Sequence, residues 1–173
     1  MSEAFLFSGE VPALGALLLS GCGLAAACFS DLKERRIPNR LNVALATGLL
    51  ALHINGAGLS GLLDGALAFA LCYGAGVLLY ALGALGAGDV KLLGALSMAL
   101  DWTLALQLLA RTALAGGILG VTRLIADGNF RHALFGLLSS ARRSQAERSS
   151  VPYALAIAAG WFWLFAAGMN WTQ

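Results

Sequence analysis

Two aspartates lie where an otherwise apolar sequence becomes polar. Asp31 follows the apolar run of residues 11–30, and Asp89 lies in LGALGAGDVKLLGAL, residues 82–96. Two carboxylates that share a site cannot both ionise freely, so the pair holds one proton between them. Such a pair can activate water for attack on a carbonyl and return a proton to the leaving amine. The chemistry that these residues would allow is hydrolysis of a peptide bond.

A structural role for both aspartates is the alternative. Asp31 would then end a helix and pair with Lys33 or Arg35, while Asp89 would stabilise a helix N-terminus and pair with a neighbouring lysine. Because structural ion pairs also perturb pKa values, the spacing alone leaves both interpretations open.

The composition favours lipid as the solvent. Of the 173 residues, 59% are hydrophobic and 12% are charged, and the mean hydropathy is +0.78. An average soluble domain is about one-quarter charged. We therefore predict a single membrane-embedded domain over residues 1–173. The three cysteines are not spaced as a metal clamp, so we expect neither a metal nor another cofactor.

Continuous apolar blocks, rather than alternating ones, predict helices, which satisfy their own backbone polar groups in lipid. The sequence thus predicts an all-α polytopic bundle of about six transmembrane helices. Residues 127–150 are predicted to form a cytoplasmic interfacial segment, with a solvated loop as the alternative. The expected helices cover approximately residues 11–30, 41–57, 60–82, 88–100, 103–123 and 151–170.

Positive charge predicts the orientation in the membrane. Ten of the eleven Lys and Arg residues lie in alternate loops, after the first, third and fifth expected helices. The positive-inside rule makes these loops cytoplasmic and leaves both termini outside. Asp31 and Asp89 would then lie at similar depth near the cytoplasmic face. Arg111 is the exception, and it is either functional or a residue that snorkels or pairs with Asp64 or Asp101.

Three segments resemble one family in the same order. GAGD at Gly86–Asp89 resembles the GxGD motif of intramembrane aspartyl proteases, and the longer GAGDVKLL resembles the type IV prepilin peptidase family. DLKERRIPNRLN from Asp31 and SSVPYALAIAAG at residues 149–160 resemble the same family. The resemblance extends over about residues 15–165. It implies a six-helix peptidase core with Asp31 and Asp89 as the catalytic residues.

The resemblance also implies a substrate and a location. These enzymes remove a short basic leader from prepilins and pseudopilins at the cytoplasmic face of the bacterial inner membrane. Larger members carry an added cytoplasmic segment, often with paired CxxC motifs, and methylate the new N-terminus. Here the loop at residues 31–40 is short and has no cysteine. We therefore expect a peptidase without methyltransferase activity, similar to the short Flp/Tad-type enzymes.

Four other residues are candidates for contact with substrate. Gly86 and Gly88 are expected to let a substrate backbone approach Asp89. Lys91 would steady a carboxylate or act as a surface anchor, and Tyr153 would border the site or lie at the membrane interface. The expected partners are a prepilin or pseudopilin substrate and membrane lipid, without nucleic acid.

Two other functions remain open from the sequence. One is a GxGD protease for another signal-like peptide, and the other is a non-enzymatic transporter or assembly subunit.

Overall fold

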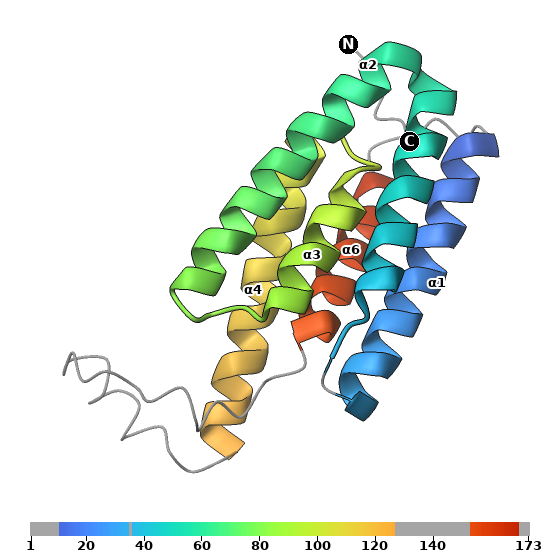
Figure 1. Cartoon of the computed structure of the whole chain (residues 1–173). Coiled ribbons are helices and arrows are strands. Elements are labelled where there is room, and N and C mark those ends of the chain that lie inside the picture. The colour runs from blue at the N-terminus through green and yellow to red at the C-terminus, as the bar shows by residue number, and fades with distance from the viewer. Residues whose placement is uncertain (1–10, 35, 127–152, 170–173) are drawn as a thin grey trace.

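The computed structural model describes residues 11–34, 36–126 and 153–169, and these residues contain helices and no strand. The predicted interfacial segment at 127–150 lies outside the described residues. Figure 1 shows the helices packed side by side as one bundle. They are α1 Val11–Glu34, α2 Asn39–Ala81, α3 Ala87–Ser97, α4 Trp102–Ala126 and α6 Tyr153–Met169.

The long helix α2 reverses direction at one glycine. Gly58 has φ 63° and ψ −141°, a conformation that only glycine adopts without strain. The two halves of α2 on either side of Gly58 run antiparallel (Figure 1). They correspond to the helices expected at 41–57 and 60–82.

The prediction of apolar, membrane-type helices is confirmed, but the count of about six spans is wrong. Among the described residues, three helices are long and apolar enough to cross a membrane: Ala13–Glu34, Trp102–Thr122 and Asn39–Ala81, the last of which consists of two antiparallel halves that meet at Gly58. The 11 residues of α3 extend about 16 Å, roughly half of a hydrocarbon core. The apolar part of α6, Tyr153–Ala166, is also short for a span.

The short helix α3 is apolar because it lies inside the protein. Residues 92–97 are all buried, and α3 packs mainly against α2. Close approach depends on small residues: a Cβ on Gly94 would lie 3.0 Å from Phe69 Cε2, and one on Gly76 would lie 3.0 Å from Val90 Cγ1. The apolar residues of α3 are therefore explained by burial among the other helices rather than by contact with lipid.

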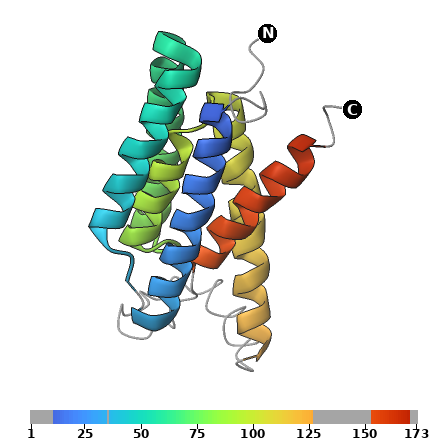
Figure 2. The same cartoon turned by 90° about the vertical axis from the view of Figure 1, so that its right-hand side faces the viewer.

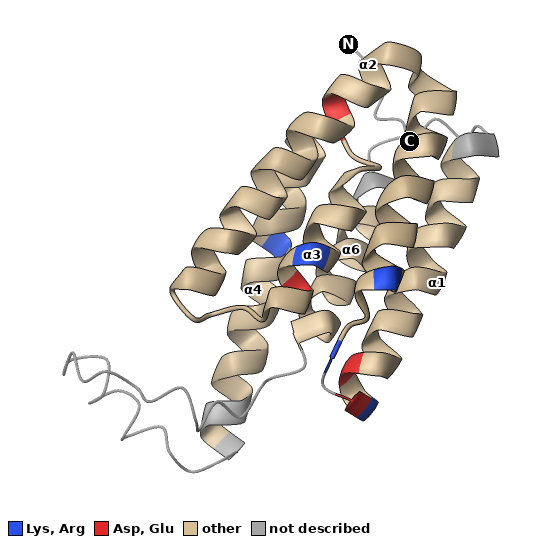
Figure 3. Cartoon of the chain, viewed as in Figure 1, with Lys and Arg blue, Asp and Glu red and all other residues tan. Residues whose placement is uncertain are grey.

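One end of the bundle gathers the candidate residues. The C-terminus of α1 and the N-termini of α2, α3 and α6 lie at this end, opposite the start of α1 and the end of α6 (Figures 1 and 2). The charged residues of α1 and α3 lie toward the same end, whereas α2 also carries an acidic residue near the opposite end (Figure 3). The structure thus brings together segments far apart in the sequence, whereas the cytoplasmic assignment of this end remains a prediction.

Candidate active site

Asp31 lies in the last turn of α1 and is half-buried. Its Oδ2 atom is buried and has no hydrogen-bond partner. Lys33 is exposed and places its ammonium 6.0 Å from the centroid of the Phe29 ring. Within the part of the chain that the structure describes, Asp31 forms no ion pair with Lys33, and the other expected partner, Arg35, lies outside that part.

Asp89 lies in the first turn of α3. Gly86 is the N-cap residue of this helix, and its backbone N–H donates to Asp89 Oδ2 at 3.2 Å. This contact is the backbone half of a capping box, and it holds the carboxylate at the positive end of the helix dipole. The preceding turn includes Gly83 at φ 76°, so the chain passes directly from the end of α2 into α3.

The two aspartates lie within electrostatic reach of one another. Burial, and then the negative charge of Asp31, raise the pKa of Asp89 from 3.8 to about 6, while the Gly86 hydrogen bond opposes the rise. Asp89 lies outside the three helices that can span a membrane. The site therefore contains two carboxylates close enough for the charge of Asp31 to affect the protonation of Asp89.

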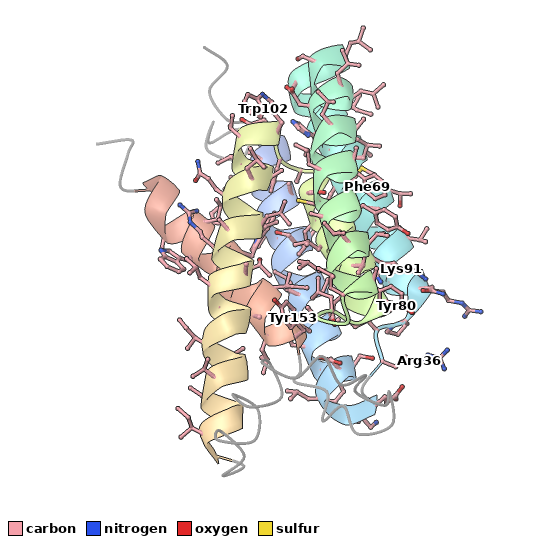
Figure 4. All side chains as sticks on the ribbon, turned by 90° about the vertical axis from the view of Figure 1, so that its left-hand side faces the viewer. Arg36, Phe69, Tyr80, Lys91, Trp102 and Tyr153 are labelled. Carbon is pink, nitrogen blue, oxygen red and sulfur yellow. The ribbon has the colours of Figure 1, made fainter. Side chains whose placement is uncertain are left out.

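Tyr153 adds an aromatic side chain beside Asp89. It is the first residue of α6 and is half-buried, and its pKa is raised by burial and by the charge of Asp89. The ring packs on α4 at Gly116, where a Cβ would collide with the tyrosine hydroxyl. Figure 4 shows Tyr153 toward the same end of the molecule as Lys91, with Trp102 at the opposite end. The helix pair α4 and α6 thus forms one side of the site.

The two glycines of the GAGD segment have different surroundings. Gly86 is exposed, whereas a Cβ on Gly88 would lie 3.3 Å from Ile37 Cβ. Gly88 therefore allows the start of α3 to pack closely on the segment that follows α1. A Cβ on Gly86 would lie 2.9 Å from Asp89 Oδ2, so the exposed Gly86 leaves room for that carboxylate.

Lys91 does not pair with Asp89 in this structure. The lysine is exposed, and its Nζ donates to Asn39 Oδ1 on α2 at 2.8 Å. Of the structural alternative for Asp89, the ion pair with the neighbouring lysine is thus absent from the described residues, whereas the contact with the helix N-terminus is present through Gly86.

Sequence reasoning missed Asn39 and Asn42 as members of this site. Asn42 is only 4% exposed, and its Nδ2 donates to the carbonyl of Gly88 at 3.4 Å. Both residues belong to the quoted segment IPNRLN, and a spacing of three places them on one face of a helix. That spacing, directly after Pro38, was the signal available in the sequence.

Arg111 lies in the middle of α4, and its Nη1 is buried without a hydrogen-bond partner. Asp101 instead caps the start of α4, because its Oδ1 accepts from Thr103 Oγ1 at 2.6 Å and from Leu104 N at 2.8 Å. The suggested pairing of Arg111 with Asp64 or Asp101 is not found among the described residues.

No cluster of three or more His, Cys, Asp or Glu side chains in the described ranges is arranged to hold a metal ion. The side chains that the site does offer are two carboxylates, a tyrosine and two amides.

Comparison with known proteins gives one match. A model of the type IV leader peptidase family matches residues 18–121, more than half of the chain, and the matched region contains both Asp31 and Asp89. No curated protein matches the chain, and neither does any solved structure.

Proposed function

Because this chain belongs to the type IV leader peptidase family, we propose that it removes the short basic leader from type IV prepilins and pseudopilins of the Flp type. Membership implies peptidase activity, and in general terms a prepilin as the substrate. The Flp-type specificity, the catalytic residues and the cellular location are the parts that we propose.

One arrangement carries the proposal: Asp31 at the end of α1 and Asp89 at the start of α3 lie at the same end of the bundle (Figure 1). There, burial and then the charge of Asp31 raise the pKa of Asp89. The ionised member of such a pair takes a proton from water, which attacks the scissile carbonyl. The protonated member polarises that carbonyl, and the proton then reaches the leaving amine. Because the pair titrates as a unit, neither residue is given a fixed role as acid or base.

The surroundings of the pair suit a peptide that lies partly in the membrane. The exposed Gly86 leaves room for a substrate backbone beside Asp89, and Tyr153 borders the same space. Lys91 supports the start of α3 through Asn39. The nearby basic residues repel a basic leader, so we assign them to the membrane orientation.

We place the protein in the bacterial inner membrane, with this site at the cytoplasmic face and both termini outside. This orientation puts the basic residues of the first loop, Arg36 and Arg40 among them, on the cytoplasmic side. We expect no methyltransferase activity, because the loop at residues 31–40 is short and has no cysteine. We expect no cofactor, because the proposed step needs only water and the two carboxylates.

Cleavage of defined precursors tests the function. The full chain, purified in detergent, is incubated with Flp-type, other type IV and preflagellin-like precursors, and the products are mapped by mass spectrometry. We expect a single cut after the basic leader of Flp-type precursors. Faster cleavage of a different precursor class would favour a GxGD protease for another signal-like peptide.

Single substitutions test the residues. Asp31→Asn and Asp89→Asn are each expected to lower the rate by roughly 100-fold or more, since each removes the shared-proton arrangement. Asp64→Asn is the matched control, because Asp64 lies on α2 outside the site, and it is expected to cleave normally. Near-normal cleavage by either site variant would exclude the dyad. In a separate test, a metal chelator is expected to leave the cleavage rate of the parent protein unchanged.

A further inference from the structure

The segment between α1 and α2 touches the neighbours of both aspartates. On one side, Ser30 Oγ, adjacent to Asp31, donates to the carbonyl of Arg36 at 2.6 Å. On the other side, Asn42 Nδ2 donates to the carbonyl of Gly88, adjacent to Asp89, at 3.4 Å. Residues 36–42, which we call the brace, are therefore bonded next to each carboxylate.

Two further contacts fix the brace to α3. Asn39 Oδ1 accepts a hydrogen bond from Lys91 Nζ at 2.8 Å, and Ile37 packs against Gly88. Gly88 and Lys91 lie on either side of Asp89 in the first turns of α3. The brace consequently holds the short segment that carries Asp89 at two points.

The stability of the fold does not explain why residue 42 is an asparagine. Asn42 is buried at 4% exposure, and its Oδ1 atom has no hydrogen-bond partner. A buried acceptor without a partner costs about 1–3 kcal/mol, whereas an apolar side chain at a buried helical position has no such cost. An amide at this position is therefore expected to serve the geometry of the site.

We propose that the brace sets the position of Asp89 relative to Asp31, with Asn42 as the central positioning residue and Asn39 as the support that acts through Lys91. The inference rests on the proposed function for its kinetic test. Asn42 acts through Gly88, and it is not itself a catalytic residue.

Kinetics separate positioning from binding. Asn42→Leu keeps a similar volume but removes the donor to Gly88, while Asn42→Gln keeps the amide. We expect Asn42→Leu to lower kcat by roughly 10- to 100-fold with KM nearly unchanged, and Asn42→Gln to recover part of the loss. Asn55→Leu, an exposed position on the same helix, is the matched control and is expected to behave as the parent. A rise in KM with kcat unchanged would overturn the proposal, because Asn42 would then bind substrate directly.

A second measurement does not require cleavage. The titration of Asp89 is followed by NMR of protein labelled with carbon-13 at the aspartate carboxyl groups, with Asp89→Asn for assignment. Among the described residues, the titratable groups that interact electrostatically with Asp89 are Asp31 from α1 and Tyr153 from α6. Lys91, two residues along α3, instead donates to Asn39 of α2. Asn42→Leu is expected to move the Asp89 midpoint toward the ordinary carboxyl range, because Asp89 then leaves its buried place beside Asp31.

The outcomes distinguish the two claims. If Asn42→Leu shifts the Asp89 titration midpoint but the parent protein cleaves none of the precursors, the brace is supported and the proposed function is wrong. Normal cleavage together with an unmoved midpoint in Asn42→Leu overturns the brace and leaves the proposed function. If Asn42→Leu fails to fold, the same titration is measured in Asn39→Ala and Lys91→Ala, because both positions are exposed. An unchanged Asp89 midpoint in both variants overturns the brace.

Discussion

Asp89 experiences opposing influences at the start of α3. The N–H of Gly86 and the helix N-terminus favour its ionised form, while burial and Asp31 favour its protonated form. Burial and like charge prevail, because the pKa is raised to about 6. A carboxyl group tuned in this direction holds a proton under conditions in which an ordinary aspartate has lost it.

This tuning makes the stability of the protein depend on pH. A carboxyl whose pKa is higher in the folded state binds its proton more tightly when folded, so it destabilises the folded protein as pH rises from about 4 to 6. The amide introduced by Asp89→Asn does not titrate, and it retains an acceptor for the N–H of Gly86. We therefore expect Asp89→Asn to gain stability relative to the parent between pH 4 and pH 8, by at most about 3 kcal/mol.

Thermal unfolding in detergent at the two pH values measures this effect. The prediction fails if the difference in Tm between parent and variant is the same at pH 4 and pH 8, or if the Tm of the variant falls relative to that of the parent at pH 8.

At the scale of single residues, the sequence singled out the two aspartates as candidates because their motifs are local and contiguous, and their catalytic role stays a prediction. It did not identify Asn42, whose bonding partner lies 46 residues away in the chain. A single amide in an apolar block carries no local sign of the residue that it will meet. Arg111 was noticed as an intramembrane charge, but its surroundings likewise depend on the packing of distant helices.

At the scale of helices, the sequence located the segments well but misjudged what surrounds one of them. The predicted helix at 88–100 corresponds to α3, Ala87–Ser97, which is too short to span. Apolar residues are required both against lipid and inside a protein, so hydropathy does not separate the two environments. Length and the buried face of α3 decide the question, and both became visible only in the structure.

The contact of α4 with α6 is expected to control the position of Tyr153. In Gly116→Ala the new methyl group occupies the place of the tyrosine hydroxyl, so the ring must move away from α4. We expect a fall in cleavage of roughly tenfold or more, since small displacements in an active site have large effects on rate. Gly117→Ala is the matched control, because a Cβ there meets nothing within 4 Å. Equal activities of the two variants would contradict a role for Tyr153 beside the dyad.

At the scale of the whole molecule, charge and apolar surface together indicate a position in the membrane. Large apolar side chains are exposed around the bundle, for example Leu18 at 71% and Leu59 at 73%, as expected where lipid is the solvent. Lys33 in the last turn of α1, and Arg36 and Arg40 around the start of α2, lie at the end that carries the two aspartates (Figures 1 and 4). The positive-inside rule then predicts which end faces the cytoplasm.

Labelling of single cysteines in intact cells tests this orientation. In a background without Cys22, Cys28 and Cys72, we introduce Ser60→Cys beside the reversal at Gly58 and Glu34→Cys at the end of α1. A membrane-impermeant maleimide is expected to label position 60 from outside, and position 34 only after permeabilisation. The reverse pattern would invert the proposed topology.

The most direct test of the central claim, that Asp31 and Asp89 work as one unit, is a double-mutant cycle on kcat/KM for leader cleavage. Residues that act together in one step give strongly non-additive losses. We predict that Asp31→Asn combined with Asp89→Asn loses no more activity than either single variant. Losses in the double variant that equal the product of the two single losses would contradict the dyad.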